Sequence, residues 1–489
     1  MSRRKKLIVR VAIAAVTAAA AVGLTALIWS RRDIPEVHAG AEAHFKYGSI
    51  GSEGRAGVPY WIWMVLPDVF GDLLPDGPGE GYERFGFVFE DNAPKGRPIG
   101  TSYREDPVPL VGLNCALCHT GVVQAEGATG QAERRVILGM PAHQLDLQGY
   151  LRFLFAVAGD DRFDADRLLP AIERINPDFD WLDAQLYRFV VIPQTRSGLL
   201  EEDSRFEWMT QFPDFGPGRV DTFNPYKFGI HEIADNHPRV GTADFPPLWN
   251  QALKEGMWLH WDGNNDSVAE RNRSAAIGAG ATEDSLDTAS LDRVAEWIGS
   301  LPAPAFPEAH IDRSLVPAGA EVYEQHCARC HSFDGELVGS VIDIGEIGTD
   351  PERLESFDEE LAAEMNTLGR GRHWRFSRFR ATNGYANLPL DGVWLRAPFL
   401  HNGSVPTLRD LLRPPEDRPI VFYRGNPAYD YDDVGFVSSR PSAGESQAEA
   451  PSGFRFDTTL RGNGNGGHLY GTDLSDGQID ALIEYLKTR

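Results

Sequence analysis

The chain has 489 residues, 42% of them hydrophobic, and its 47 basic and 71 acidic residues give a formal net charge of −24. Seven basic residues lie in the first 32 positions, so the remainder carries 40 basic against 71 acidic residues, a net charge of −31. This balance argues against nucleic acid and anionic lipid surfaces as partners, and favours a basic redox partner or none. The length suffices for two domains with hydrophobic cores.

The amino terminus predicts export. An apolar run at residues 11–29 stands between basic residues, which are Arg3, Arg4, Lys5, Lys6 and Arg10 before it and Arg31 and Arg32 after it. Its nineteen residues exceed the usual signal-peptide core of about 7 to 15 and approach the roughly 20 that span a bilayer. We therefore expect a periplasmic protein anchored in the inner membrane by residues 11–29. The alternative is a secreted protein whose signal peptide is cleaved.

All four cysteines fall in two copies of one motif, Cys115-Ala116-Leu117-Cys118-His119 and Cys327-Ala328-Arg329-Cys330-His331. In C-x-x-C-H the two thiols face the same way on one helical turn and add to the porphyrin vinyl groups, while the histidine reaches the iron. A thioredoxin-like redox site has no role for the doubled histidine. Zinc sites usually hold their halves about 15 to 20 residues apart, whereas 208 residues lie between Cys118 and Cys327. The sequence therefore predicts two covalent c-type haems with His119 and His331 as proximal ligands.

Helical patterns divide the chain. Residues 140–158 and 167–175 have helical periodicity, and residues 181–191 have it more weakly. Residues 290–301 carry an apolar stripe that ends at the prolines of 302–307. In the second half, residues 317–325 lead into Cys327, and residues 474–487 form a closing helix with a Ser475–Gln478 capping box.

Each half thus holds one haem motif and one closing helix. We predict a mainly α fold of two tandem cytochrome c-like haem domains with helical and loop additions. The predicted divisions are a signal anchor or signal peptide at 1–32, an N-terminal haem domain with insertions at 33–305 and a C-terminal haem domain at 306–489. Residues 440–453 are a polar loop.

The sixth iron ligands decide the function, because a closed iron passes electrons and an open one binds peroxide or dioxygen. For the second haem we favour His468, since the glycines before it allow the backbone to turn an imidazole inward. His401 is the alternative, and either histidine could instead occupy a turn. After His119 no histidine or methionine follows until Met140 and His143, where helix-start packing is the simpler role. The N-terminal haem is therefore the candidate for substrate chemistry.

Trp261 and Trp249 are the candidate catalytic residues, because an indole between two haems can carry an electron. Core packing is the more common role of tryptophans in such an aromatic stretch. His260 and Asp262 are candidate acid or base groups by their position in the same stretch alone.

Beyond these motifs, the "APFLHNGSVPTLRDLL" stretch resembles the bacterial di-haem cytochrome c peroxidase superfamily. Within it, "HFKYGSIGSE", "PYWIWMVLPDVF", "GMPAHQLDLQ", "HWDGNNDSV" and "GHLYGTDLS" resemble the branch of the rubber oxygenase RoxA, over nearly all of residues 44–489. The resemblance implies two haem sites at the C-x-x-C-H motifs and, in that branch, a late histidine on the second iron, which His468 matches.

The chain departs from the peroxidases at two places. Neither the distal histidine expected shortly after the first motif nor the ligand expected after the His401 element is present. The resemblance is compatible with a calcium ion between the domains, although no spacing is typical of a calcium loop.

Three functions fit these observations. The first is an oxidoreductase that activates peroxide or dioxygen at the N-terminal haem and acts on an organic substrate. In it the C-terminal haem relays electrons, and a small redox protein is the electron donor. The second is a non-enzymatic electron-transfer cytochrome. The third is a redox sensor or docking subunit.

Overall fold

The computed structural model describes residues 34–489 apart from 106, 127–131, 232, 234–236 and 440–452. The predicted anchor at 11–29 and most of the predicted loop at 440–453 lie outside the described residues. In the described part, none of the helices combines the length and the apolar character that crossing a membrane requires.

The fold is mixed α/β, so the prediction of a mainly α fold is wrong. Helices take up 42% of the chain and strands 13%, in several small sheets. The largest sheet is antiparallel with the order β1-β3-β4-β2. Its strands are β1 Ile34–Pro35, β2 Val58–Pro59, β3 Thr101–Glu105 and β4 Pro109–Leu113. Each is too short for an alternating pattern to stand out in the sequence, and pairing with distant strands stabilises it.

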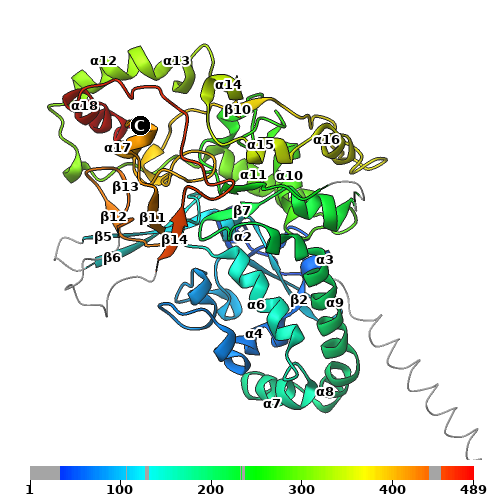
Figure 1. Ribbon diagram of the computed structural model, residues 1–489. Helices are drawn as coiled ribbons and strands as arrows, with labels where there is room; N and C mark the ends of the chain where they lie inside the picture. The colour runs from blue at the N-terminus through cyan, green and yellow to red at the C-terminus, as the bar shows by residue number, and fades with distance from the viewer. Residues whose placement is uncertain (1–33, 106, 127–131, 232, 234–236, 440–452) are drawn as a thin grey trace, which may run out of the picture.

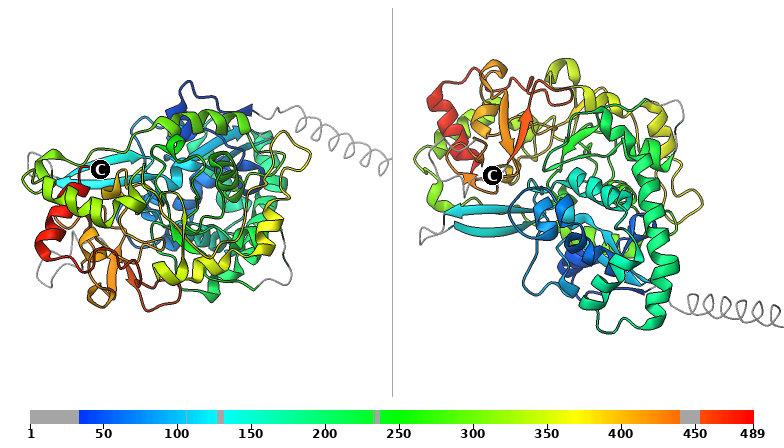
Figure 2. Two further views of the ribbon diagram at one scale, coloured as in Figure 1. Left: turned by 90° about the horizontal axis from the view of Figure 1, so that it is seen from above. Right: turned by 60° about the horizontal axis from the view of Figure 1, so that its bottom comes forward.

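The remaining strands form two-stranded pairs. These pairs are β5 Thr120–Glu126 with β6 Ala132–Leu138, β7 Arg219–Asp221 with β8 Thr242–Asp244, β9 Val341–Asp343 with β10 Gly384–Ala386, β11 Val421–Arg424 with β14 Phe454–Asp457, and β12 Tyr429–Asp430 with β13 Gly435–Phe436. The β5–β6 hairpin begins directly after His119. It reaches the C-terminal half, where the Gln124 backbone N–H donates to the Pro427 carbonyl at 2.7 Å, and Figure 2 shows the hairpin extending along that half.

The predicted helices are present. They are α6 Leu147–Gly159, α7 Ala165–Ile175, α8 Trp181–Leu186, α11 Thr288–Ser300, α12 Val316–His326 and α18 Asp476–Leu486. α6 begins later than expected because the Asp146 side chain caps it, accepting from the Gly149 N–H at 2.8 Å. The predicted capping box of Ser475 and Gln478 is confirmed at α18.

Other helices were not predicted, except for the helical turns at the two C-x-x-C-H motifs. α8 continues through the π-helical turn η4 Tyr187–Val191 into α9 Ile192–Arg205. The others are α2 Ala41–Tyr47, α3 Glu53–Ala56, α4 Tyr60–Val69, α5 Cys115–Cys118, α10 Val268–Gly278, α13 Ala328–His331, α14 Ile344–Ile347, α15 Glu352–Ser356, α16 Glu359–Met365 and α17 Leu408–Leu411. Figure 1 shows α4 and α6–α9 gathered at one end of the molecule and α12, α13, α17 and α18 at the other.

The closing helices cross an entering helix in both halves. α12 crosses α18 so closely that a Cβ at Gly319 would collide with the Ala481 carbonyl, and Tyr323 packs on Tyr485 with 5.1 Å between ring centroids. In the first half α2 plays the entering role, with Phe45 against Trp297 of α11 at 5.2 Å.

The cores of the two halves are not separate. One buried cluster gathers Trp63, Tyr82 and Phe153 within the first half. A second combines Trp249 of the first half with Trp394 and Leu482 of the second. The division into domains at residue 305 stays a prediction.

Candidate functional site

The first C-x-x-C-H motif is held as one helical turn, α5. Asn114 caps the turn by accepting from the Ala116 N–H at 3.0 Å, and its amide donates to the Gly48 carbonyl at 3.0 Å, which ties the motif to the end of α2. His119 lies 2.8 Å from the Pro246 carbonyl through Nδ1. Because a carbonyl oxygen can only accept, Nδ1 is the protonated nitrogen, and Nε2 keeps the lone pair that a metal needs.

The second motif repeats this arrangement. Cys327 ends α12, and the next turn, α13, carries Cys330 and His331. His331 Nδ1 donates to the Leu388 carbonyl at 2.8 Å, so its Nε2 is also left as the ligand nitrogen. Burial lowers the pKa of His331, and burial together with the nearby Arg271 charge lowers the pKa of His119 to about 3. Both rings are therefore neutral, as a ligating imidazole must be.

The carbonyls that hold the two histidines belong to equivalent loops. Each is followed by Pro-Leu, at Pro247-Leu248 and at Pro389-Leu390. Further along each loop, two residues form an isolated antiparallel bridge, Leu259 with Asn265 and Phe399 with Val405. Each loop then leads into a helix whose N-cap is a hydroxyl side chain, Ser267 for α10 and Thr407 for α17.

This alignment makes Trp261 the counterpart of His401. Gly263 and Gly403 match as left-handed turn residues, with φ of 67° and 60°. This repeat could not be recognised in the sequence, because the two loops share their turn geometry but few residue types.

The structure brings His468 opposite His331. Their ring centroids lie 6.4 Å apart, with 38° between the planes. Two metal–imidazole bonds of about 2.0 Å each, plus about 1.1 Å from each nitrogen to its ring centre, predict about 6.2 Å for two imidazoles on one iron. The separation therefore fits a metal ion between the two rings.

The backbone before His468 has the expected unusual conformation. His468 and Gly467 have positive φ of 48° and 74°, and a Cβ at Gly467 would collide with the backbone of Gly348. Burial lowers the pKa of His468 to about 4, and His331 and Arg418 add to the effect. His468 Nδ1 is buried and has no hydrogen-bond partner in the part of the chain that the structure describes.

His401 is engaged elsewhere. Its Nε2 lies 3.1 Å from the Tyr385 hydroxyl, and the two rings stack with 4.1 Å between centroids. Its carbonyl accepts from the Asp244 N–H at 2.9 Å. The ring that faces His331 in the described chain is that of His468.

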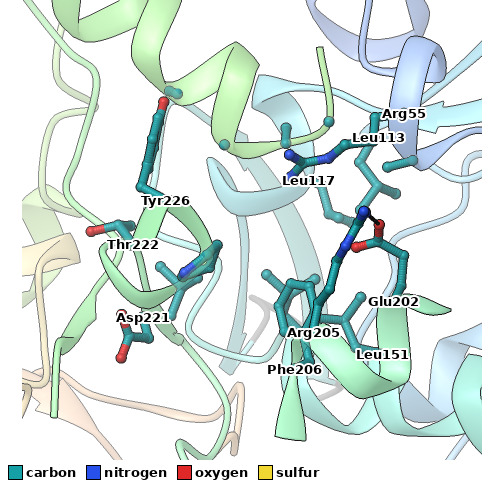
Figure 3. Close-up of a pocket in the computed structure, with 18 of the residues that line it drawn as sticks. Arg55, Leu113, Leu117, Leu151, Glu202, Arg205, Phe206, Asp221, Thr222 and Tyr226 are labelled. Atoms are coloured by element: carbon teal, nitrogen blue, oxygen red, sulfur yellow. Dashed lines mark hydrogen bonds and ion pairs between the residues drawn. The ribbon is translucent and has the colours of Figure 1, made fainter. Parts of the chain in front are cut away.

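A cavity of about 950 Å³ opens at His119. On one side it is lined by Cys118, His119, Trp261, Arg271 and Phe379, and on the other by apolar residues of α6 and α9 with their neighbours, among them Leu147, Leu151, Leu154, Phe155, Val190, Leu199 and Phe206. Figure 3 shows Asp221, Thr222 and Tyr226 on one wall and Leu151, Arg205 and Phe206 on the other. Its size and mostly apolar lining are those of a small-molecule site.

Met140 and His143 do not line this cavity. Met140 is fully buried against Gly121. The His143 ring stacks on Phe436 at 3.6 Å. α6 begins at Leu147, so both residues pack in the turns before the helix and not in its first turn.

Trp261 and Trp249 have different surroundings. Trp261 lines the cavity and donates from Nε1 to the Asp244 carbonyl at 2.9 Å. The Trp261 carbonyl accepts from the Ala386 N–H at 2.6 Å. Ala386 lies two residues before Leu388, whose carbonyl accepts from His331. Trp261 thus lies between the cavity and the second motif. Trp249 is fully buried, and its Nε1 donates to the Leu138 carbonyl at 3.3 Å within the core.

His260 and Asp262 also have different surroundings. The His260 ring lines the cavity, and burial lowers its pKa well below the usual value, so the ring is neutral. Asp262 is buried and accepts from Arg353 at 3.3 Å, and burial raises its pKa to about 6. Asp262 therefore anchors the loop that presents His260 and Trp261.

The ligand chemistry of the described residues is limited to these motifs. No group of three or more His, Cys, Asp or Glu side chains is arranged around a common point for a metal ion in the described part of the chain. The calcium prediction therefore has no assigned ligands. The donor sets that are present, two thiols and a histidine with free Nε2, fit c-type haem.

A match to a protein family supports the assignment of a c-type haem, and two uncharacterized proteins are similar in sequence. Residues 384–423, which contain Leu388 and His401, match the family described as "RoxA-like, cytochrome c-like". An uncharacterized protein y4iJ of Sinorhizobium fredii strain NBRC 101917 / NGR234 is 26% identical over 88% of this chain and 88% of its own length. A second uncharacterized protein of that strain, y4iM, is 29% identical over 57% of this chain and 71% of its own length. The chain is thus similar to RoxA-like cytochromes, with the c-type haem that such a domain implies.

Proposed function

We propose that the protein is an exported di-haem c-type oxidoreductase. It would use peroxide or dioxygen at the haem held by Cys115, Cys118 and His119 to oxidise an organic substrate. The haem held by Cys327, Cys330 and His331 would relay electrons. The match to a RoxA-like cytochrome supports a haem oxidoreductase, and the placement of substrate chemistry at the first haem is our inference.

The observation that carries the proposal is the difference between the two sites. His331 faces a second imidazole at 6.4 Å, which suits a closed iron that passes electrons. His119 opens onto a cavity of about 950 Å³ with a mostly apolar lining, which would hold the porphyrin and whose remaining space suits a small oxidant beside an organic molecule. A haem at the first site supplies an iron centre that binds dioxygen or peroxide and exchanges electrons.

The protein's own groups have defined tasks. The Pro246 carbonyl fixes the tautomer of His119. The apolar side chains of α6 and α9 bind and orient the substrate and exclude water. The His260 ring at the wall is neutral and can donate or accept a hydrogen bond, because burial lowers its pKa and disfavours a second proton. Trp261 is the electron path toward the second site, and the net charge of −31 beyond Arg32 suits a small basic redox protein as donor.

Turnover of the purified haem-loaded protein tests the proposal. We expect oxygen uptake with an apolar substrate, or peroxide turnover with an electron donor, together with a high-spin band that cyanide or CO abolishes. If neither iron binds these ligands, the protein is an electron-transfer cytochrome instead. Fractionation of producing cells tests the periplasmic location and the membrane anchor.

A further inference from the structure

α10 turns one face toward the cavity at His119. Arg271, Ser274, Ala275 and Gly278 line the cavity with the spacing of a single helical stripe. The Ser274 hydroxyl is used within the helix, since it donates to the Arg271 carbonyl at 2.8 Å. Arg271 is therefore the charged side chain that α10 contributes to the cavity wall.

Arg271 differs from the other arginines that line the cavity. Arg205 pairs with Glu202 at 2.7 Å, Arg353 with Asp262 at 3.3 Å, and Arg55 donates to the Gly229 carbonyl at 3.2 Å. Within the described ranges, the Arg271 guanidinium takes part in neither a hydrogen bond nor an ion pair.

The guanidinium remains charged. Burial lowers the pKa of Arg271 to about 10, and the nearby Cys115 thiol raises it. No carboxylate of the described residues contributes to the pKa of Arg271. Arg271 is partly buried in the mostly apolar cavity wall, and a cation that is largely withdrawn from water ordinarily has an anionic partner.

We propose that Arg271 binds a carboxylate in the cavity at His119, and that the organic substrate is an apolar chain bearing one carboxylate. The substrate class rests on the proposed function. The planar guanidinium can hold a carboxylate through two parallel hydrogen bonds, while the leucine and phenylalanine side chains of α6 and α9 enclose the chain.

A propionate of the haem offers the same carboxylate chemistry. Arg271 acts electrostatically on Cys115, the residue that would hold the vinyl edge of the porphyrin. The propionates leave the porphyrin from the opposite edge. The Arg271 charge also acts on His119, so Arg271 lies beside the haem attachment site, and an experiment distinguishes the two carboxylate sources.

The experiment compares decanoate with decanol, probes of equal length with and without the charge. Binding to the haem-loaded protein is measured by calorimetry and by the change in the haem absorption band, in wild type, Arg271→Leu and Arg271→Lys. Arg239→Leu is the control, because Arg239 is an exposed arginine paired with Glu355 at 2.7 Å. Haem content and circular dichroism verify that each variant is folded.

We expect Arg271→Leu to weaken decanoate binding about tenfold or more, the loss typical of a charged hydrogen-bond partner. Arg271→Lys retains part of the affinity, and decanol and the control are unaffected. If Arg271→Leu instead shifts the propionate bending bands in the resonance Raman spectrum and the two probes bind wild type equally, the carboxylate is the haem's own.

The carboxylate site is refuted if Arg271→Leu changes neither decanoate binding nor those bands. Loss of oxygen or peroxide turnover alone would overturn the proposed function and leave the binding result standing. Conversely, turnover of a neutral apolar substrate without decanoate binding would overturn only the carboxylate site.

Discussion

Replacement of His468 by alanine tests whether the second iron is closed by two imidazoles. The 6.4 Å between the His331 and His468 ring centroids fits one iron with two nitrogen bonds. Removing the second imidazole leaves an open position, so the second haem should change from low-spin to high-spin. With two haems per chain, about half of the total haem signal should change.

Electron paramagnetic resonance and absorption spectra measure this change, and cyanide or CO titration measures the new open position. Haem content should not change, because the Cys327 and Cys330 thioethers hold the porphyrin without the sixth ligand. His401→Ala is the matched control, since His401 is buried and its ring is hydrogen-bonded to Tyr385, whereas the ring that faces His331 is that of His468. The assignment is wrong if the low-spin signal survives in His468→Ala or disappears in His401→Ala.

Three further predictions follow from the same geometry. Replacing Cys115 and Cys118 together by serine should halve the haem content in a pyridine haemochrome assay, and an unchanged content would refute the first site. Trp261→Phe should slow electron exchange between the haems in stopped-flow reduction. Trp249→Ala should leave that rate unchanged and lower the free energy of unfolding by about 3–5 kcal/mol. The opposite pattern would exchange the roles of the two tryptophans. Burial raises the pKa of Asp262 to about 6 in the folded protein, so its contribution to stability is present below about pH 4 and is lost as the pH rises through about 6. Denaturant titrations of wild type and Asp262→Asn should therefore differ in their pH dependence across that window, and parallel curves would contradict the assignment.

The sequence alone predicts the covalent chemistry of this protein. Two C-x-x-C-H motifs with no other cysteine predict haem attachment because the spacing within one helical turn is sufficient for the reaction. The helices with a continuous apolar stripe, such as α11 and α18, were predictable because their packing face is written in local periodicity. His468 was identified from the glycines beside it, and the structure brings it opposite His331.

Tertiary structure decided what lies around each haem site. The short strands and α2 are stabilised by partners far away in the chain, and their sequences carry no strong period, so the mixed α/β fold was missed. α6, α9 and α10 line the cavity at His119, and the absence of a partner for Arg271 among the described residues is a property of that assembled wall. A residue's neighbours across the fold depend on packing that no local pattern encodes, which is why Trp261 and Trp249 could be separated only in three dimensions.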